Sequence, residues 1–123
     1  MKKILIIDDY PFIKDQIYML LHNYKDIEIK QLLDPYNTRK IIDEFKPDLV
    51  ILDIEFNLPI SGYELGLFII KEYNIPIVIF TGSDNNFNTE KLKPIGILNK
   101  YIIDNDDMKI QLKNIMKKLN WEI

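Results

Sequence analysis

The sequence contains no cysteine, which excludes disulfide bridges and thiolate metal sites. It also lacks a long apolar run, because none approaches the roughly 18 residues that a membrane-spanning helix needs. The first residues, MKKILIIDD, have the basic start of a signal peptide, but the apolar run is only four residues long and then meets two aspartates. We therefore expect a cytoplasmic protein with no membrane partner.

Basic residues are not in excess, because 16 Lys and Arg stand against 19 Asp and Glu and the net charge is −3. A chain of this charge has no electrostatic footprint for DNA or RNA, so we expect no direct nucleic-acid partner. Its 47% hydrophobic and 28% charged residues are typical of a soluble globular protein. The 123 residues suffice for a proper core, and we expect one domain spanning residues 1–123.

Apolar strand-like stretches alternate with helix-like stretches along the whole chain. The expected strands are 3–8, 27–33, 48–53, 76–80 and 95–100, and the expected helices are 11–24, 37–46, 61–73, a brief 88–93, and 106–119. Three of the strands are almost wholly apolar, as strands covered on both faces should be. This order predicts an α/β fold, in which a parallel sheet carries helices on both faces.

Several residues mark where these helices begin and end. Pro11 suits the first turn of the first helix, and Ser61 followed by Glu64 three residues later is the capping-box signature of a helix start. Pro47 and Pro94 follow the second and fourth helical stretches, which they cannot continue. The last helix carries an apolar face that consists of Met108, Leu112, Ile115, Met116 and Leu119.

Chemically active side chains stand where the expected strands end. Asp8 and Asp9 follow the first strand, Asp53 ends the third, Thr81 follows the fourth and Lys100 ends the fifth. Right-handed crossovers bring these ends to one edge of the sheet, where α/β proteins bind their ligands. Each residue alone has an ordinary explanation as a solvated or strand-end side chain, but the combination indicates a site.

The charges of this group predict its chemistry. Carboxylates that face one another are unfavourable unless a cation joins them, and a hard cation such as Mg²⁺ prefers oxygen ligands. One carboxylate in such a site can attack a phosphoryl group and become an aspartyl phosphate. A metal ion and an ammonium group would then balance the charge on the transferring phosphoryl oxygens, and a nearby hydroxyl could donate to the phosphoryl group after it arrives.

With these residues in this order, the chain resembles the receiver domain of two-component response regulators. The resemblance covers essentially the whole chain, and it rests on the ordered set ILIIDDY, DLVILDIEF, SGYEL, PIVIFTGS and GILNK. It implies a flavodoxin-like, doubly wound sheet of five parallel strands in the order 2-1-3-4-5, with a short fourth helix. It also implies a signalling domain that catalyses only its own phosphoryl transfer and dephosphorylation, and is otherwise no enzyme.

The resemblance assigns a role to each residue of the site. Asp53 would be the phosphoacceptor, Asp9 and Asp53 would bind Mg²⁺ together with the backbone carbonyl of Glu55, and Asp8 would support them. Thr81 would be the switch hydroxyl and Lys100 would contact the phosphoryl group. The implied partner is a sensor histidine kinase or a histidine phosphotransfer protein. The kinase, the downstream effector and any homodimer are left open.

The chain departs from the usual receiver pattern at four places. Tyr101 follows Lys100 where proline is usual, so a cis bond there would cost about 3–4 kcal/mol. Ile97 stands where a tyrosine or phenylalanine usually takes part in the switch. The loop from Asp53 to Gly62 is one residue longer than the commonest pattern, and the segment between Thr81 and Lys100 is short, which shortens the fourth helix of the output surface. We therefore expect intact phosphorylation chemistry with an altered readout.

Two other interpretations remain. The chain could be a receiver-like module that binds proteins without being phosphorylated, which the altered fourth helix and Ile97 favour slightly. It could also be a flavodoxin-like cofactor binder, but such proteins need a Gly- and Ser/Thr-rich phosphate loop where this chain has acids. Outside the site, we expect His22 to be a surface residue, and we expect Trp121 either to pack on the domain or to belong to an interface.

Overall fold

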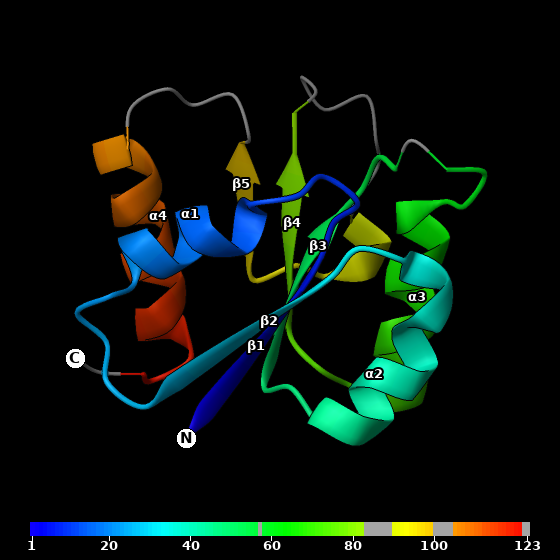
Figure 1. The fold of residues 1–123 in the computed structure, drawn as a ribbon, viewed down its shortest axis with the longest axis horizontal. Helices are drawn as coiled ribbons and strands as arrows, with labels where there is room; N and C mark the ends of the chain where they lie inside the picture. The colour runs from blue at the N-terminus through cyan, green and yellow to red at the C-terminus, as the bar shows by residue number, and fades with distance from the viewer. Residues whose placement is uncertain (57, 83–89, 100–104, 122–123) are drawn as a thin grey trace.

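A five-stranded parallel sheet forms the centre of the computed structural model, which describes residues 1–56, 58–82, 90–99 and 105–121 (Figure 1). The strand order is β2-β1-β3-β4-β5, which confirms the predicted flavodoxin-like topology. The strands are β1 (Lys2–Ile7), β2 (Ile27–Leu32), β3 (Leu49–Asp53), β4 (Ile77–Thr81) and β5 (Gly96–Asn99).

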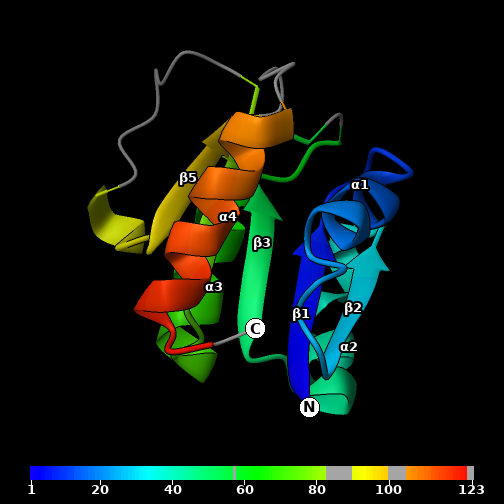
Figure 2. The same ribbon diagram turned by 90° about the vertical axis from the view of Figure 1, so that its left-hand side faces the viewer.

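Helices cover both faces of this sheet, as the alternation in the sequence predicts. The α-helices are α1 (Ile13–Leu20), α2 (Thr38–Phe45), α3 (Gly62–Tyr73) and α4 (Asn105–Lys118), and the short 3-10 helices are η1 (Pro35–Asn37) and η2 (Glu90–Leu92). In Figure 2, α1 and α4 lie in front of the sheet, and α2 and α3 lie behind it. None of the helices in the described ranges is long and apolar enough to cross a bilayer.

The two faces of the sheet form two separate apolar cores. On one face Ile4 and Ile6 of β1 pack with Ile17 of α1 and Leu112 of α4. On the other face Leu5 of β1 belongs to the core that α2 and α3 cover. The alternation along β1 follows from the strand geometry, in which successive side chains point to opposite faces. The fully buried part of β1, residues 4–7, is therefore apolar, and its two lysines stand at the more exposed start of the strand.

The register of the parallel strands aligns their carboxyl ends. Ile7 of β1 pairs with Leu32 of β2 on one side and with Leu52 of β3 on the other. The residues that follow Ile7 and Leu52 are acidic, so the chain places two carboxylates side by side where the apolar strands stop. At the other side of β3, Asp53 pairs with Phe80 of β4, and this leaves Thr81 at the same edge.

Helix α1 begins later and ends earlier than the sequence predicts. Pro11 lies in the turn before the helix instead of its first turn, because Phe12 adopts the left-handed conformation (φ 73°) and delays the helical backbone to Ile13. The helix ends at Leu20, and the amide of Tyr24 then closes a further turn by donating to the carbonyl of Leu21. The helix of residues 11–24 was therefore predicted too long at both ends, although Tyr24 still packs against the core.

The start of α3 confirms the sequence signal there. The hydroxyl of Ser61 accepts a hydrogen bond from the backbone amide of Glu64 at 3.2 Å, which is the cap that the capping-box pattern predicts. At the other end of this helix, the hydroxyl of Tyr73 donates to the carboxylate of Asp43 in α2 at 2.7 Å. Burial and this hydrogen bond raise the pKa of Tyr73 above its usual value of 10.0. The contact joins the two helices that cover this face of the sheet.

The connection from β4 to β5 is described at residue 82 and at residues 90–95. Its described residues form only the 3-10 helix η2, in agreement with the short fourth helix that the sequence predicts. Leu98 of β5 is fully buried, whereas Ile97 is 42% exposed. The side chain that replaces the usual aromatic residue therefore lies partly in solvent on an edge strand.

The structure also tests the predictions made for His22 and Trp121. His22 is exposed, as predicted, and its Nδ1 lies 2.7 Å from the carbonyl oxygen of Met19. Trp121 is buried in the core beside α1 and α4, and the ammonium group of Lys2 lies 5.7 Å from the centre of its ring. Of the two alternatives for Trp121, packing on its own domain is the one observed.

Candidate functional site

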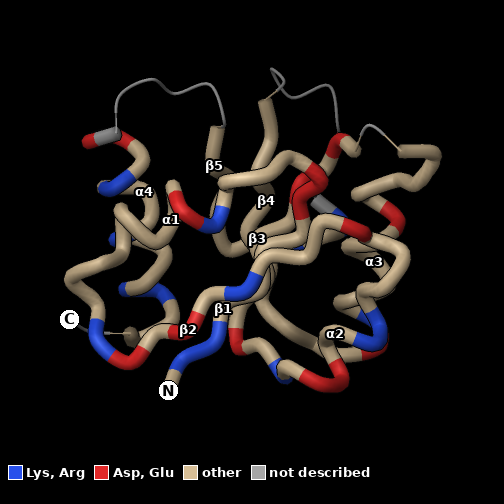
Figure 3. The backbone as a smooth tube through the Cα atoms, viewed as in Figure 1, with Lys and Arg blue, Asp and Glu red and all other residues tan. Residues whose placement is uncertain are grey.

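Three carboxylates meet at the carboxyl ends of β1 and β3. Oxygen atoms of Asp8, Asp9 and Asp53 all lie within 4.8 Å of one another. Figure 3 shows red, acidic segments where these two strands end. Asp8 and Asp53 are buried, with exposed fractions of 0% and 1%, while Asp9 is half-buried. The structure therefore brings together the three acids that the sequence placed at these strand ends.

The backbone around Asp8 continues the ladder of the sheet and then turns away. The amide of Asp8 donates to the carbonyl of Leu32 at 3.2 Å, which extends the pairing of β1 with β2 by one bond. Its Oδ1 then accepts a hydrogen bond from the amide of Tyr10 at 2.9 Å. This turn is the local reason why an aspartate fits here, because its short side chain bonds the backbone two residues later.

Asp53 is held in the same way at the end of β3. Its Oδ1 accepts a hydrogen bond from the amide of Glu55 at 2.9 Å, which orients the carboxylate. Glu55 also forms an isolated antiparallel bridge with Ser61, and this returns the chain to the start of α3. The longer loop between Asp53 and Gly62 is therefore closed on itself by a backbone pair.

Gly62 brings α3 into direct contact with this strand end. A Cβ atom on Gly62 would lie 2.5 Å from the carbonyl oxygen of Asp53 and 2.6 Å from that of Ile54, which is closer than real Cβ atoms come. Only glycine lets the first turn of the helix lie on the backbone that carries Asp53. The position of the carboxylate is thus set from two sides, by the Glu55 amide and by the helix.

The remaining predicted residues lie at the ends of β4 and β5. Thr81 is 4% exposed and pairs with Asn99 of β5, so its position at the acidic edge agrees with the sequence. Lys100 follows Asn99 directly, but it lies outside the described residues. Glu55, two positions beyond Asp53 in the sequence, was predicted to contribute its backbone carbonyl to a metal ion. This role stays a prediction.

The donor set at this edge suits a hard divalent cation. Asp8, Asp9 and Asp53 offer only carboxylate oxygens, which Mg²⁺ and Ca²⁺ prefer over nitrogen or sulfur ligands. Three like charges within 4.8 Å repel one another unless a cation or a proton reduces the charge. The cluster therefore has both the ligand type and the electrostatic requirement of a small cation site.

Gln31 in β2 is a residue that the sequence analysis did not single out. Its side-chain amide donates to the backbone carbonyls of Asp8 and Tyr10 and accepts from the amide of Lys14. The signal that could have revealed it is its place in the strand: it follows Ile27 and Ile29 at alternating positions, on the side of the sheet that α1 covers. A polar side chain on an inward-facing position needs partners.

The comparison with family models gives one match over most of the chain. The model of the response regulator receiver domain matches residues 4–118. Among curated proteins, a protein-glutamate methylesterase/protein-glutamine glutaminase of Syntrophus aciditrophicus is 24% identical over 95% of this chain and 35% of its own length. The sensory transduction protein LytT of Bacillus anthracis is 31% identical over 65% of this chain and 32% of its own. The chain thus spans about a third of the length of these relatives.

Solved structures match over nearly the whole chain. The response regulator domain of CheB from Thermotoga maritima superposes with a TM-score of 0.78 at 16% identity and covers 100% of this chain and 99% of its own, which supports the fold. The response regulator protein TrrA of the same organism, solved in complex with Mg²⁺ and a beryllium fluoride, has a TM-score of 0.73 at 27% identity and covers 94% of this chain and 99% of its own.

Proposed function

This chain belongs to the family of response regulator receiver domains, and from this we propose that it accepts a phosphoryl group on Asp53 in a Mg²⁺-dependent phosphorelay reaction. The observation that carries the proposal is the cluster of Asp8, Asp9 and Asp53, whose carboxylate oxygens lie within 4.8 Å of one another. It stands at the edge of the sheet where Thr81 also lies.

In the proposed reaction, Asp53 is the nucleophile. A carboxylate oxygen of Asp53 attacks the phosphorus of a phosphohistidine on the donor, and the new O–P bond forms as the N–P bond breaks. The electron pair of the broken bond stays on the imidazole nitrogen of the donor, and the product is an aspartyl phosphate. The Glu55 amide, which donates to Oδ1 at 2.9 Å, supports this role because it holds the carboxylate in one orientation.

The other acids of the cluster would hold the cation. We assign Asp9, Asp53 and the backbone carbonyl of Glu55 as its protein ligands, with Asp8 supporting them from its buried position. A bound Mg²⁺ would neutralise the developing charge on the phosphoryl oxygens. The acids themselves would provide the negative charge that binds the cation. Hydrogen bonds from backbone amides to Asp8 and Asp53 orient these two carboxylates before any ligand arrives.

Two further residues would act on the phosphoryl group. Thr81 would donate its hydroxyl proton to a phosphoryl oxygen, and its 4% exposure at the end of β4 is consistent with an inward-facing role. Lys100, which follows β5 directly in the sequence, would supply a positive charge to the phosphoryl group. This hydrogen bond from Thr81 would form only once the phosphoryl group is present, so it would couple phosphorylation to the position of the loop after β4.

The donor would be a sensor histidine kinase or a histidine phosphotransfer protein, in keeping with the family. The sequence has one histidine, His22, which is exposed and follows the end of α1 at Leu20. We therefore propose that the phosphohistidine of the donor lies outside residues 1–123. In this role the chain catalyses only its own phosphorylation and dephosphorylation.

The test is phosphorylation with a small donor. The chain is incubated with phosphoramidate and Mg²⁺, and its intact mass is measured. We expect the wild type to gain one phosphoryl group that alkali removes, and Asp53→Asn to gain none because the amide is not an anionic nucleophile. Asp15→Asn, which changes an exposed aspartate of α1, is the matched control and should behave as the wild type.

Labelling of Asp53→Asn at the wild-type rate would contradict the assignment of Asp53. A wild type that folds but gains no mass from phosphoramidate would contradict the proposal as a whole. That result would instead support the second interpretation, a receiver-like module that binds proteins without phosphorylation.

A further inference from the structure

The loop between β1 and α1 carries two of the three clustered acids, and its last residue is unfavourable where it joins the helix. The residue before α1 is Phe12, which adopts the left-handed conformation at φ 73°. A side chain with a Cβ atom pays a cost in that conformation, about 1–2 kcal/mol per residue. Phenylalanine also cannot accept a hydrogen bond, so it cannot cap the helix in the way that Ser61 caps α3.

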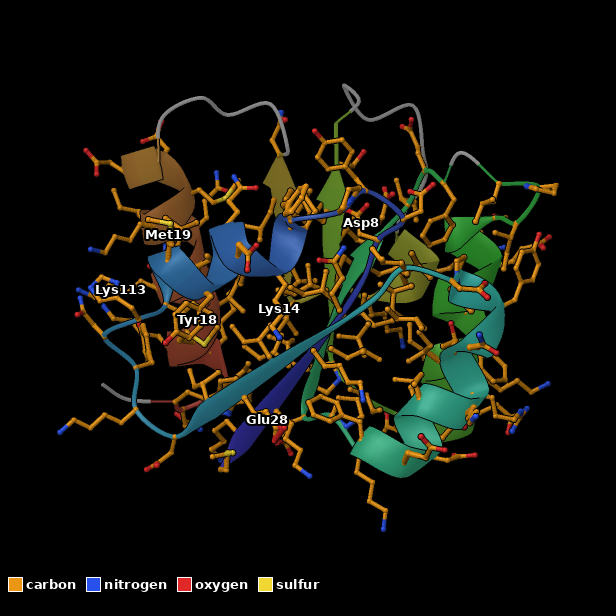
Figure 4. The ribbon with its side chains drawn as sticks, in the orientation of Figure 1. Asp8, Lys14, Tyr18, Met19, Glu28 and Lys113 are labelled. Carbon is orange, nitrogen blue, oxygen red and sulfur yellow. The ribbon has the colours of Figure 1, made fainter. Side chains whose placement is uncertain are left out.

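A single side chain from the neighbouring strand supplies the missing bonds. Nε2 of Gln31 donates to the carbonyl of Asp8 at 3.0 Å and to the carbonyl of Tyr10 at 2.8 Å, and its Oε1 accepts from the amide of Lys14 at 2.8 Å. Figure 4 labels Asp8 and Lys14, which lie at the two ends of the loop that these bonds span. Gln31 is therefore bonded to the beginning and the middle of this loop and to the first turn of α1.

The chemistry of the three partners matches a primary amide in one orientation only. The carbonyls of Asp8 and Tyr10 can only accept, and the amide of Lys14 can only donate. Two donors and one acceptor on one side chain are what glutamine provides and what glutamate, methionine or lysine does not. Lys14 is the second residue of α1, so Oε1 also takes the position that an N-cap side chain normally occupies.

We infer that Gln31 is a positioning residue of the phosphorylation site: it holds the loop of Asp8 and Asp9 so that both acids face Asp53. This inference rests on the proposed function, because it assumes that these acids hold the cation. Gln31 touches neither the cation nor the phosphoryl group, and acts through the backbone of the residues that do. It lies beside Ile6 in the register of β1 and β2, so the sheet itself fixes the base of its side chain.

The experiment compares Mg²⁺ binding to the full chain and to two glutamine variants by calorimetry, well below the unfolding temperature of each. Gln31→Met keeps the length of the side chain but removes all three hydrogen bonds, and we expect its Mg²⁺ affinity to fall about tenfold, as when a group that orients a metal ligand is lost. The matched control is Gln16→Met in α1, whose side-chain amide lies 3.8 Å from the sulfur of Met108 in α4. It should bind Mg²⁺ as the wild type does.

A third variant separates failure of this inference from failure of the proposed function. Asp9→Ala removes an assigned ligand and should abolish Mg²⁺ binding. If it does and Gln31→Met still binds as the wild type, the role of Gln31 is wrong while the site stands. If Asp9→Ala binds Mg²⁺ normally, the cation site lies elsewhere and both proposals are overturned.

The metal-free wild type gives a second readout that does not depend on any variant folding. In the inferred arrangement both Nε2 protons of Gln31 are in hydrogen bonds, so they should exchange with water more slowly than those of an exposed glutamine in an NMR experiment. Exchange at the rate of an exposed side chain would contradict the inference even if Gln31→Met failed to fold.

Discussion

At the scale of single residues, the acidic site is built by backbone hydrogen bonds as much as by the carboxylates. Asp8 and Asp53 each accept from the amide two positions later, at 2.9 Å in both cases. These bonds orient the acids before any ligand arrives, so less of the binding free energy is lost in ordering them. The same reasoning gives Gly62 a role, because it allows a helix to lie against the carbonyl of Asp53.

Gly62→Ala is expected to damage the site more than it damages the fold. The new Cβ atom would meet two backbone carbonyl oxygens at 2.5 and 2.6 Å, and the backbone of Asp53 and Ile54 would have to shift. We expect a loss of about 1–3 kcal/mol in the free energy of unfolding, as for other overpacked positions. Phosphorylation by phosphoramidate should slow strongly at the same time, and both quantities can be measured on one preparation.

The control for this prediction is Gly66→Ala in the same helix. A Cβ atom there would meet side-chain atoms of Leu92 at 2.9 Å and Leu52 at 3.0 Å, which can adjust by rotation, and not the backbone of the site. It should lower stability while leaving the phosphorylation rate near that of the wild type. Equal slowing in both variants would mean that Gly62 acts only through stability.

At the scale of secondary-structure elements, the start of α1 is not determined by the sequence of the helix alone. Its first turn follows a strained residue and is capped by a side chain from β2. Helices of this length depend on tertiary contacts, since eight residues are too few for a stable isolated helix. The start of α1 is therefore a property of the β2–α1 contact and not of residues 11–14 alone.

Replacing Phe12 tests the strain at this helix start. Phe12 is 73% exposed, so its side chain contributes little burial, and asparagine tolerates the left-handed conformation much better. We expect Phe12→Asn to raise the free energy of unfolding by up to about 1 kcal/mol. Chemical denaturation gives the value, with Tyr18→Asn as the matched control, because Tyr18 is 60% exposed in the interior of the same helix.

In the control, asparagine replaces an aromatic residue in a helical conformation, so it should leave stability unchanged or lower it slightly. A loss of stability in Phe12→Asn of the same size as in Tyr18→Asn would contradict the claim that the left-handed residue carries a cost.

The elements that the sequence predicted well are those whose signals are local. The apolar strands β1, β3 and β4, the cap of α3 at Ser61 and the buried face of α4 all agree with the pattern of their own residues. The limits of α1 and the role of Gln31 could not be predicted in this way. The start of α1 and the role of Gln31 both depend on the hydrogen bond between Lys14 and Gln31, which are 17 positions apart, and periodicity carries no information on such contacts.

The candidate site shows the same division. Strand ends and topology predicted that Asp8, Asp9, Asp53 and Thr81 lie at one edge, because parallel strands with helical crossovers must end together. The close approach of α3 at Gly62 could not be predicted, since the residues near Ser61 do not indicate which backbone the start of the helix contacts. The role of Lys100 remains a prediction.

At the scale of the whole molecule, the sheet separates two cores that share no helix. The core beside α1 and α4 includes Leu98, and the core beside α2 and α3 includes Leu92 of η2. The acidic site lies at the carboxyl ends of β1 and β3, the strands whose side chains alternate between these two cores.

We expect a phosphate mimic to act mainly near Thr81. A hydrogen bond from its hydroxyl to a charged acceptor is worth about 1.5–3 kcal/mol and should draw Thr81 inward. Ile97 has no ring to move between buried and exposed positions, and it is already 42% exposed. With beryllofluoride and Mg²⁺, the NMR shifts of the Thr81 and Gly82 amides should therefore exceed those in α4. Shifts of equal size from Leu112 to Trp121 would show that the usual output face still responds.

The position of Trp121 determines what intrinsic fluorescence can report. This single tryptophan lies beside Lys2, at the start of β1, whereas the acids follow the end of the same strand. Six residues at about 3.3 Å each separate the two ends, a distance of roughly 20 Å. An ion or phosphoryl group at the acidic edge is too distant to quench the indole by contact, while unfolding exposes the ring to water. Emission from Trp121 should therefore follow denaturation with the same curve whether or not the site is loaded, apart from the shift in midpoint that ligand binding causes.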